Sequence, residues 1–144
     1  MALWLVKTEP ETYSFEQLMK DKRTSWDHVR NYTARNNLMA MKVGDEAFVY
    51  HSVGPKSIVG ICRVVREHYP DASAIDEGEP ADRWVAVDVE PVRKLKSEVT
   101  LAQLKASKTL SQMDLVKQSR LSVTSVTAAQ WKAILKLAGE GDAA

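Results

Sequence analysis

The sequence predicts an α+β fold, a single small mixed barrel of five strands with short helices at its ends and one in its middle. Two observations lead to this prediction. Five short runs are apolar, β-branched or alternating and are bounded by turn residues, as strands are. Three other runs begin with Ser or Thr and carry Gln three residues later, the pattern of a capped helix. A doubly wound sheet would need longer, regularly alternating helices.

The N-terminal third predicts a strand and two helices. Residues 2–7 form a short apolar run that suits a buried strand. The run Ser14-Phe-Glu-Gln17 fits a capping box that begins a helix over residues 15–20. Residues 31–41 carry a sparse apolar stripe and predict a short helix.

The middle of the chain predicts three strands. Residues 47–50 and 57–66 are apolar or β-branched and are separated by a Gly-Pro turn. Residues 84–89 alternate between apolar and polar positions, and the strand continues toward Lys96. Because proline has no N–H to donate, Pro91 predicts a strand edge or a bulge at that point.

The C-terminal third predicts a helix, a strand and a second helix. Capping boxes begin helices at Thr100 and at Thr127, and residues 120–126 form a closing strand between them. Gly139 is expected to end the last helix. The apolar face of that helix is expected to consist of Trp131, Ile134, Leu135 and Ala138.

Length and composition indicate one soluble globular domain. The chain has 144 residues, of which 44% are hydrophobic and 27% charged, enough to bury a core without disulfides. We expect residues 1–139 to form the domain and residues 140–144 a short tail. The single cysteine, Cys62, excludes an internal disulfide and a multi-cysteine zinc site. The chain shows no long apolar run and no secretory segment, so we expect a cytoplasmic monomer, nuclear if the source is eukaryotic, with no membrane partner.

Basic and acidic residues are unevenly distributed. Residues 1–66 carry 10 Lys or Arg against 7 Asp or Glu, residues 91–144 carry 9 against 4, and residues 67–90 carry 1 against 8. A fold that separated these segments would present one face to a polyanion. Ordinary solvated surface charge explains the same pattern, so charge alone does not identify a ligand.

The segment 26–37, Trp-Asp-His-Val-Arg-Asn-Tyr-Thr-Ala-Arg-Asn-Asn, is the most informative part of the chain. It holds two large aromatic rings, three side-chain amides and two arginines, with almost no aliphatic residues between them. A segment that only packs a core would be rich in Leu, Ile and Val. These side chains instead stack, form hydrogen bonds and hold phosphate. The segment therefore predicts a pocket for a planar polar ligand, and a nucleobase is the obvious candidate.

A series of short blocks resembles the EVE domain family, a branch of the PUA-like fold related to YTH domains. The blocks, in chain order, are residues 4–10, 13–14, 26–27, 29–31, 34–38, 41–45, 50–52, 58–60, 69–71, 83–84, 99–101 and 120–123. The resemblance implies a PUA-like pseudo-barrel of five to six mainly antiparallel strands with short flanking helices. It also implies a non-enzymatic nucleic-acid-binding domain whose pocket accepts a flipped, modified cytosine or adenine in DNA or RNA. Thr33 departs from the Gln of many members, and the loop 76–82 is shorter than in many members.

Candidate site residues follow from the side chains that a base needs. Turning a base out of its stack costs a few kcal/mol, and one aromatic ring returns about 1–3 kcal/mol, so edge hydrogen bonds and phosphate contacts must add to stacking. For phosphate we predict Arg30 and Arg35. No metal, cofactor or catalytic residue is predicted. The predicted base-binding residues are Trp26, Asn31, Tyr32, Asn36, Asn37, Lys7, Thr8, His51 and Ser52.

Several of these residues also have a purely structural interpretation. Trp26 could belong to the core, Asn31 could cap a helix, Tyr32 could pack, and Arg35 could pair with Asp27 or Asp45. The remaining tryptophans, Trp4, Trp84 and Trp131, are assigned to the core, and Cys62 is expected to be a buried small hydrophobic residue.

Two other functions stay open. An enzyme acting on modified nucleic acid would need a general base, for which His28 or His51 with Asp27 is available, but no histidine has a metal-ligand spacing and the 6 glycines are scattered. A protein-interaction module would make the polar character of segment 26–37 incidental.

Overall fold

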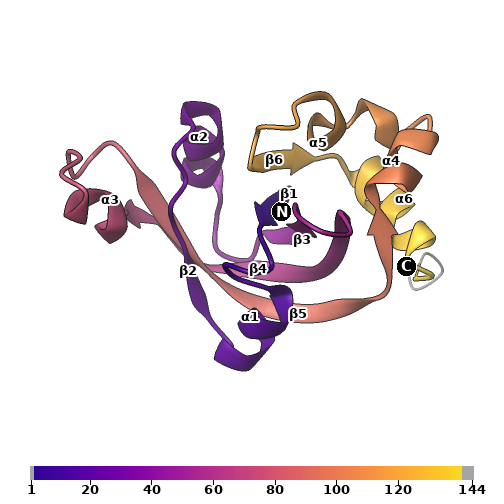
Figure 1. Cartoon of the computed structure of the whole chain (residues 1–144), viewed down its shortest axis with the longest axis horizontal. Coiled ribbons are helices and arrows are strands. Elements are labelled where there is room, and N and C mark those ends of the chain that lie inside the picture. The colour runs from indigo at the N-terminus through magenta and orange to yellow at the C-terminus, as the bar shows by residue number, and fades with distance from the viewer. Residues whose placement is uncertain (1, 141–144) are drawn as a thin grey trace.

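The computed structural model describes residues 2–140 as a strongly curved, six-stranded mixed sheet with short helices around it (Figure 1). The order in the sheet is β2-β5-β4-β3-β1-β6, and only the pair β1–β3 is parallel. This agrees with the predicted α+β fold of five to six mainly antiparallel strands. The strands are β1 (Leu3–Thr8), β2 (Thr24–Trp26), β3 (Glu46–His51), β4 (Ser57–Pro70), β5 (Val85–Thr100) and β6 (Val123–Val126).

The long antiparallel strands β4 and β5 pair next to the edge strand β2, with α3 in their connection at one end and α4, α5 and α6 gathered at the other (Figure 1). Pro91 lies opposite Cys62 next to a register shift, and the pairing of β2 with β5 ends at Val89. Pro91 therefore has a strand on one side only and sits beside a bulge, as predicted.

Local capping decides where most helices begin. Thr100 and Thr127 each form the complete predicted capping box. Ser14 caps α1 by accepting from the Gln17 N–H at 3.0 Å, but the Gln17 amide donates to Asp21 instead of returning to the cap. The helices are α1 (Phe15–Asp21), α2 (Tyr32–Ala40), α3 (Ala72–Asp76), α4 (Leu101–Ala106), α5 (Asp114–Lys117) and α6 (Ala128–Leu137), with the 3₁₀ helix η1 (Leu110–Gln112).

The segment that follows α6 differs in part from the predicted tail. Gly139 adopts a left-handed φ of 82° and ends the helix as expected. Glu140, assigned from sequence to the tail, is held in place, because its carboxylate accepts from Arg93 and from the Lys96 N–H. The remainder of the predicted tail, residues 141–144, lies outside the described residues.

Hydrophobic side chains pack on both faces of the sheet because successive residues of a strand point to opposite sides. On β1, Trp4 and Val6 join one cluster and Leu5 joins the other. The first cluster includes residues of α1 and α2, and the second includes Trp131 of α6, which stacks on Phe48 at 3.8 Å between ring centroids. The three tryptophans assigned to the core, and Cys62, are all buried. None of the helices described here is long and apolar enough to cross a membrane.

Candidate functional site

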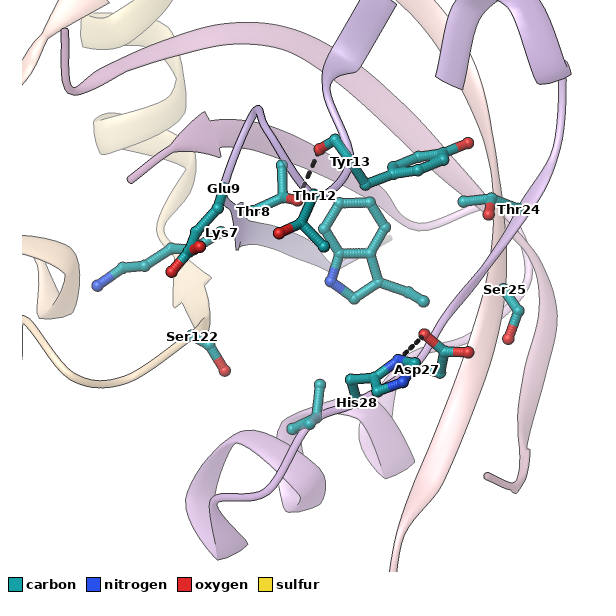
Figure 2. A pocket seen from close by; sticks show the side chains of 12 residues that line it. Lys7, Thr8, Glu9, Thr12, Tyr13, Thr24, Ser25, Asp27, His28 and Ser122 are labelled. Atoms are coloured by element: carbon teal, nitrogen blue, oxygen red, sulfur yellow. Dashed lines mark hydrogen bonds and ion pairs between the residues drawn. The ribbon is translucent and has the colours of Figure 1, made fainter. Parts of the chain in front are cut away.

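A cavity of about 610 Å³ opens where β1, β2 and the start of β6 approach one another (Figure 2). Its volume lies within the range of roughly 300–1,000 Å³ that small-ligand sites occupy. Ten of its twelve lining residues, all except Trp26 and Val29, carry a polar or charged side chain, so the cavity suits a ligand with hydrogen-bonding edges. The twelve lining residues are Lys7, Thr8, Glu9, Thr12, Tyr13, Thr24, Ser25, Trp26, Asp27, His28, Val29 and Ser122.

One side of this first cavity is an aromatic wall formed by Trp26 and Tyr13. Trp26 ends β2 and is only 8% exposed, and Tyr13 meets it edge to face, with 6.5 Å between ring centroids. The Tyr13 hydroxyl donates to Asp21 Oδ2 at 2.8 Å, and burial raises the pKa of this phenol above its ordinary value. A planar ligand can therefore contact aromatic surface that is already fixed in position.

Polar groups surround the aromatic wall. Asp27 and His28 lie together at the cavity, with 2.6 Å between Oδ1 and Nδ1 (Figure 2). Thr8 donates its hydroxyl to the Tyr13 carbonyl at 2.7 Å and so fixes the turn that carries Thr12 and Tyr13. Lys7 Nζ donates to the Ser119 carbonyl at 2.7 Å, and burial, helped by nearby Lys56, lowers the pKa of Lys7.

A strap, residues 27–31, connects β2 to α2 and is held from outside by Asp71. His28 adopts a left-handed φ of 62°, and its N–H donates to Asp71 Oδ2 at 2.9 Å. Arg30 donates to the same oxygen at 3.0 Å, while Ser73 donates to Oδ1. Burial alone would raise the pKa of Asp71, but the hydrogen bonds from Ser73, His28 and Arg30 outweigh it and lower this pKa to about 2. The Asp71 carboxylate thus latches the strap onto the start of α3.

Three of the residues predicted to bind the base line the first cavity: Lys7, Thr8 and Trp26. The other six lie outside it and make internal contacts. Ser52 is one of the six, and both its N–H and its hydroxyl donate to the Thr8 carbonyl. His51 is another, and its Nε2 accepts from the Phe15 N–H at 3.2 Å. Burial lowers the pKa of His51.

The four predicted base-binding residues of α2 and its cap point elsewhere. Asn31 caps the helix by accepting from the Ala34 N–H, and Asn37 donates to the Val123 carbonyl at 2.7 Å. Asn36 accepts from the Arg35 guanidinium. Tyr32 stacks on the buried Trp84 with 4.9 Å between ring centroids.

Both arginines predicted to hold phosphate are engaged within the protein. Arg30 pairs with Asp71 and, at 2.7 Å, with Glu77. Arg35 donates to the Arg83 carbonyl and to Asn36, and its guanidinium lies 4.9 Å from the centre of the Tyr32 ring. Neither partner considered from sequence for Arg35, Asp27 or Asp45, forms an ion pair with it in residues 2–140. The structure therefore does not bring the two arginines to the first cavity.

The sequence interpretation missed most of the cavity lining. Asp27 and His28 follow Trp26 directly, so their position beside the ring was a usable signal. Tyr13 belongs to a block that resembles the EVE family, but its contact with Trp26 depends on the tertiary fold. Glu9, Val29 and Ser122 also fall in blocks that resemble the EVE family, whereas no sequence signal marked Thr12, Thr24 and Ser25.

Comparison with known proteins identifies the family. The sequence model of the EVE domain matches residues 2–137. This chain belongs to the EVE domain family. Among EVE relatives, human thymocyte nuclear protein 1 is 36% identical over an alignment that covers 93% of this chain and 72% of the human protein.

Two solved structures resemble the whole fold. A protein of Agrobacterium tumefaciens superposes with a TM-score of 0.91 and 37% identity, covering 99% of this chain and 96% of that chain. The human THYN1 protein in complex with 5-methylcytosine-containing DNA superposes with a TM-score of 0.87 and 35% identity, covering 96% of this chain and 98% of that chain.

Proposed function

We propose that this EVE-family chain binds nucleic acid and takes one base, turned out of its stack, into the first cavity. The observation that supports this most directly is the cavity itself, in which a fixed aromatic wall is surrounded by hydroxyl, carboxylate and imidazole groups. The complex of human THYN1 with 5-methylcytosine-containing DNA supports the same function at family level. On this basis we propose a modified base, cytosine or adenine, as the ligand.

The energy balance assigns a role to the polar residues. Removing a base from its stack costs a few kcal/mol, and stacking on an aromatic ring returns about 1–3 kcal/mol. Asp27 supplies a carboxylate, which accepts a hydrogen bond from an exocyclic amine, and both cytosine and adenine carry such an amine. The hydroxyls of Thr12 and Ser25 both donate and accept, and so suit the remaining base edge.

We infer that the role is binding and not catalysis. Of the two histidines considered as general bases, His51 has its Nε2 occupied by the Phe15 N–H, and only His28, paired with Asp27, lines the cavity in residues 2–140. Incubation with a 5-methylcytosine oligonucleotide, followed by mass spectrometry, is expected to return the oligonucleotide unchanged. A product that disappears in His28→Ala would establish an enzyme instead.

A variant that fills the cavity tests the proposed function. Thr12 is exposed and lines the cavity, so Thr12→Phe should occupy space meant for the base without disturbing the core. We expect oligonucleotide affinity to fall at least about tenfold, with the loss concentrated in the preference for methylated over unmethylated cytosine. Thr109→Phe, at an exposed threonine outside the cavity lining, is the matched control. Equal binding by Thr12→Phe and the unchanged protein would remove the base from this cavity.

A further inference from the structure

A second cavity, of about 330 Å³, lies where the N-terminus of α2 meets the segment 117–121. Its lining is almost entirely polar and includes two cations and no acidic residue. The seven residues are Asn31, Thr33, Lys117, Gln118, Ser119, Arg120 and Leu121.

The two cations of the second cavity are free to bind a ligand. In residues 2–140, Arg23, Arg30, Arg63, Arg83 and Arg93 all form ion pairs, whereas Lys117 and Arg120 form none. Both side chains are exposed. The nearby Asp114 accepts from the Gln118 side chain at 3.5 Å. No ion pair among residues 2–140 therefore neutralises Lys117 or Arg120.

The N-terminus of α2 adds backbone N–H donors, which also favour an anion. Asn31 satisfies the Ala34 N–H, and the first turn of this nine-residue helix contains no acidic side chain. The leading N–H groups of a helix have no partner within the helix and favour an anion. Together with Lys117 and Arg120, they make a setting for a group with several acceptor oxygens and negative charge.

The second cavity shares its walls with the first. The strap supplies Val29 to the first cavity and Asn31 to the second, and the segment before β6 supplies Ser122 to the first and Leu121 to the second. Lys7, which lines the first cavity, donates to the carbonyl of Ser119, which lines the second. A base in the first cavity would thus have its own backbone close to the second.

We infer that the second cavity binds a backbone phosphate beside the base held in the first cavity, with Lys117 and Arg120 as its charged contacts. The inference rests on the proposed function and assigns the phosphate role to residues other than Arg30 and Arg35. Phosphate contacts release counterions, so they set the slope of affinity against salt, whereas contacts to the base set the preference for methylation.

The test is the double variant Lys117→Ala/Arg120→Ala with a 5-methylcytosine oligonucleotide and its unmethylated counterpart. We expect affinity about tenfold lower for both oligonucleotides at low salt, an unchanged preference for methylation, and a salt slope reduced by about 1. Lys132→Ala/Lys136→Ala, at two exposed lysines of α6, removes the same charge and is expected to change affinity by less than about twofold. If the alanine variant melts at a lower temperature, Lys117→Gln/Arg120→Gln removes the two charges while keeping a polar, partly extended side chain at each position, and answers the same question.

A neutral methylphosphonate placed beside the methylated base sharpens the test. It should weaken binding by the unchanged protein and have little further effect on the double variant. Equal losses in the two double variants, or independent effects of the methylphosphonate and the substitutions, would overturn the phosphate site and leave the base cavity standing. Failure of the unchanged protein to bind any oligonucleotide would overturn the proposed function and the phosphate site together.

Discussion

Tyr13 and Trp26 meet edge to face, with an interplanar angle of 87° and 6.5 Å between ring centroids. The two residues reach this contact from different elements, since Tyr13 precedes α1 and Trp26 ends β2. Because the Tyr13 hydroxyl donates a hydrogen bond to Asp21 in α1, this helix holds the Tyr13 ring in place against the indole. The aromatic wall is thus a tertiary feature.

Loss of the Tyr13 ring should reduce binding more than loss of its hydroxyl. Tyr13→Phe keeps the edge-to-face contact, so we expect oligonucleotide affinity to stay within about threefold of the unchanged protein. Tyr13→Ala removes this contact and should weaken binding about tenfold. Fluorescence anisotropy with a labelled 5-methylcytosine oligonucleotide measures both. Equal losses in the two variants would assign the effect to the hydroxyl.

Trp26 contributes to stability as well as to the cavity. It is 8% exposed and belongs to the hydrophobic cluster that contains Phe15 and Leu18. Trp26→Ala should therefore lower the free energy of unfolding by about 3–5 kcal/mol, measured in urea. Trp26→Phe keeps an aromatic ring and separates binding from folding better. A Trp26→Ala protein with unchanged stability would show that the ring serves the ligand alone.

Asp71 should make stability depend on acid pH. Its folded pKa of about 2 lies below the ordinary value of 3.8, so the stabilisation is complete above about pH 4 and is lost as the pH falls toward 2. Asp71→Asn should lower the free energy of unfolding by about 2 kcal/mol at pH 7 and by much less near pH 2.5. Asp82→Asn, at an exposed carboxylate, is the control. A pH-independent difference between Asp71→Asn and the unchanged protein would contradict this account.

His51 should make stability depend on pH in a less acidic range. Burial lowers its folded pKa below 6.5, so its neutral form is stabilised, and that stabilisation is complete above the unfolded pKa and declines as the pH falls below it. Protonation would also remove the Nε2 acceptor from the Phe15 N–H. The melting temperature of the unchanged protein should therefore drop between pH 7.5 and pH 5.5 by more than that of His51→Gln. His68→Gln, at an exposed histidine, should behave like the unchanged protein.

Gly60 should not tolerate a side chain. A Cβ at this position would lie 2.4 Å from Phe15 Cζ, far closer than van der Waals contact with the ring of a buried side chain allows. Gly60→Ala should cost about 1–3 kcal/mol of unfolding free energy, measured in urea. Phe15→Leu should recover part of that loss when combined with Gly60→Ala, although alone it destabilises. Simple additivity of the two substitutions would place the strain elsewhere.

Patterns that act within a few residues predicted much of the fold. The boxes at Thr100 and Thr127, the stop at Gly139 and the irregularity at Pro91 depend on neighbours in sequence and were confirmed. The strand β2 was missed because three residues are too short for any period. The strands β4 and β5 extend beyond the predicted ranges because their ends are stabilised by each other, as in the pairing of Tyr69 with Ala86.

The candidate site was predicted less completely because one segment proved to serve two structures. Residues 26–29 line the first cavity, whereas residues 32–37 form part of α2, where Asn37 bonds to β6 and Tyr32 packs on Trp84. Composition shows that a segment is polar and aromatic, but it does not show where the chain changes direction. Lys7 and Thr8 line the first cavity, because the first strand ends there. Roles in ligand binding stay predictions for all these residues.

The latch between Asp71 and the strap has a consequence for energetic coupling. The hydrogen bond from the His28 N–H to Asp71 joins residues 43 apart, so it depends on the tertiary fold, in which Asp71 follows the last residue of β4. Opening the latch would release one wall of the first cavity without unfolding the sheet, a local fluctuation that amide hydrogen exchange at His28 reports directly. A ligand that needs the closed wall would then bind more weakly in proportion to the open fraction. Substitutions around Asp71, which does not line the cavity, would therefore lower ligand affinity from a distance.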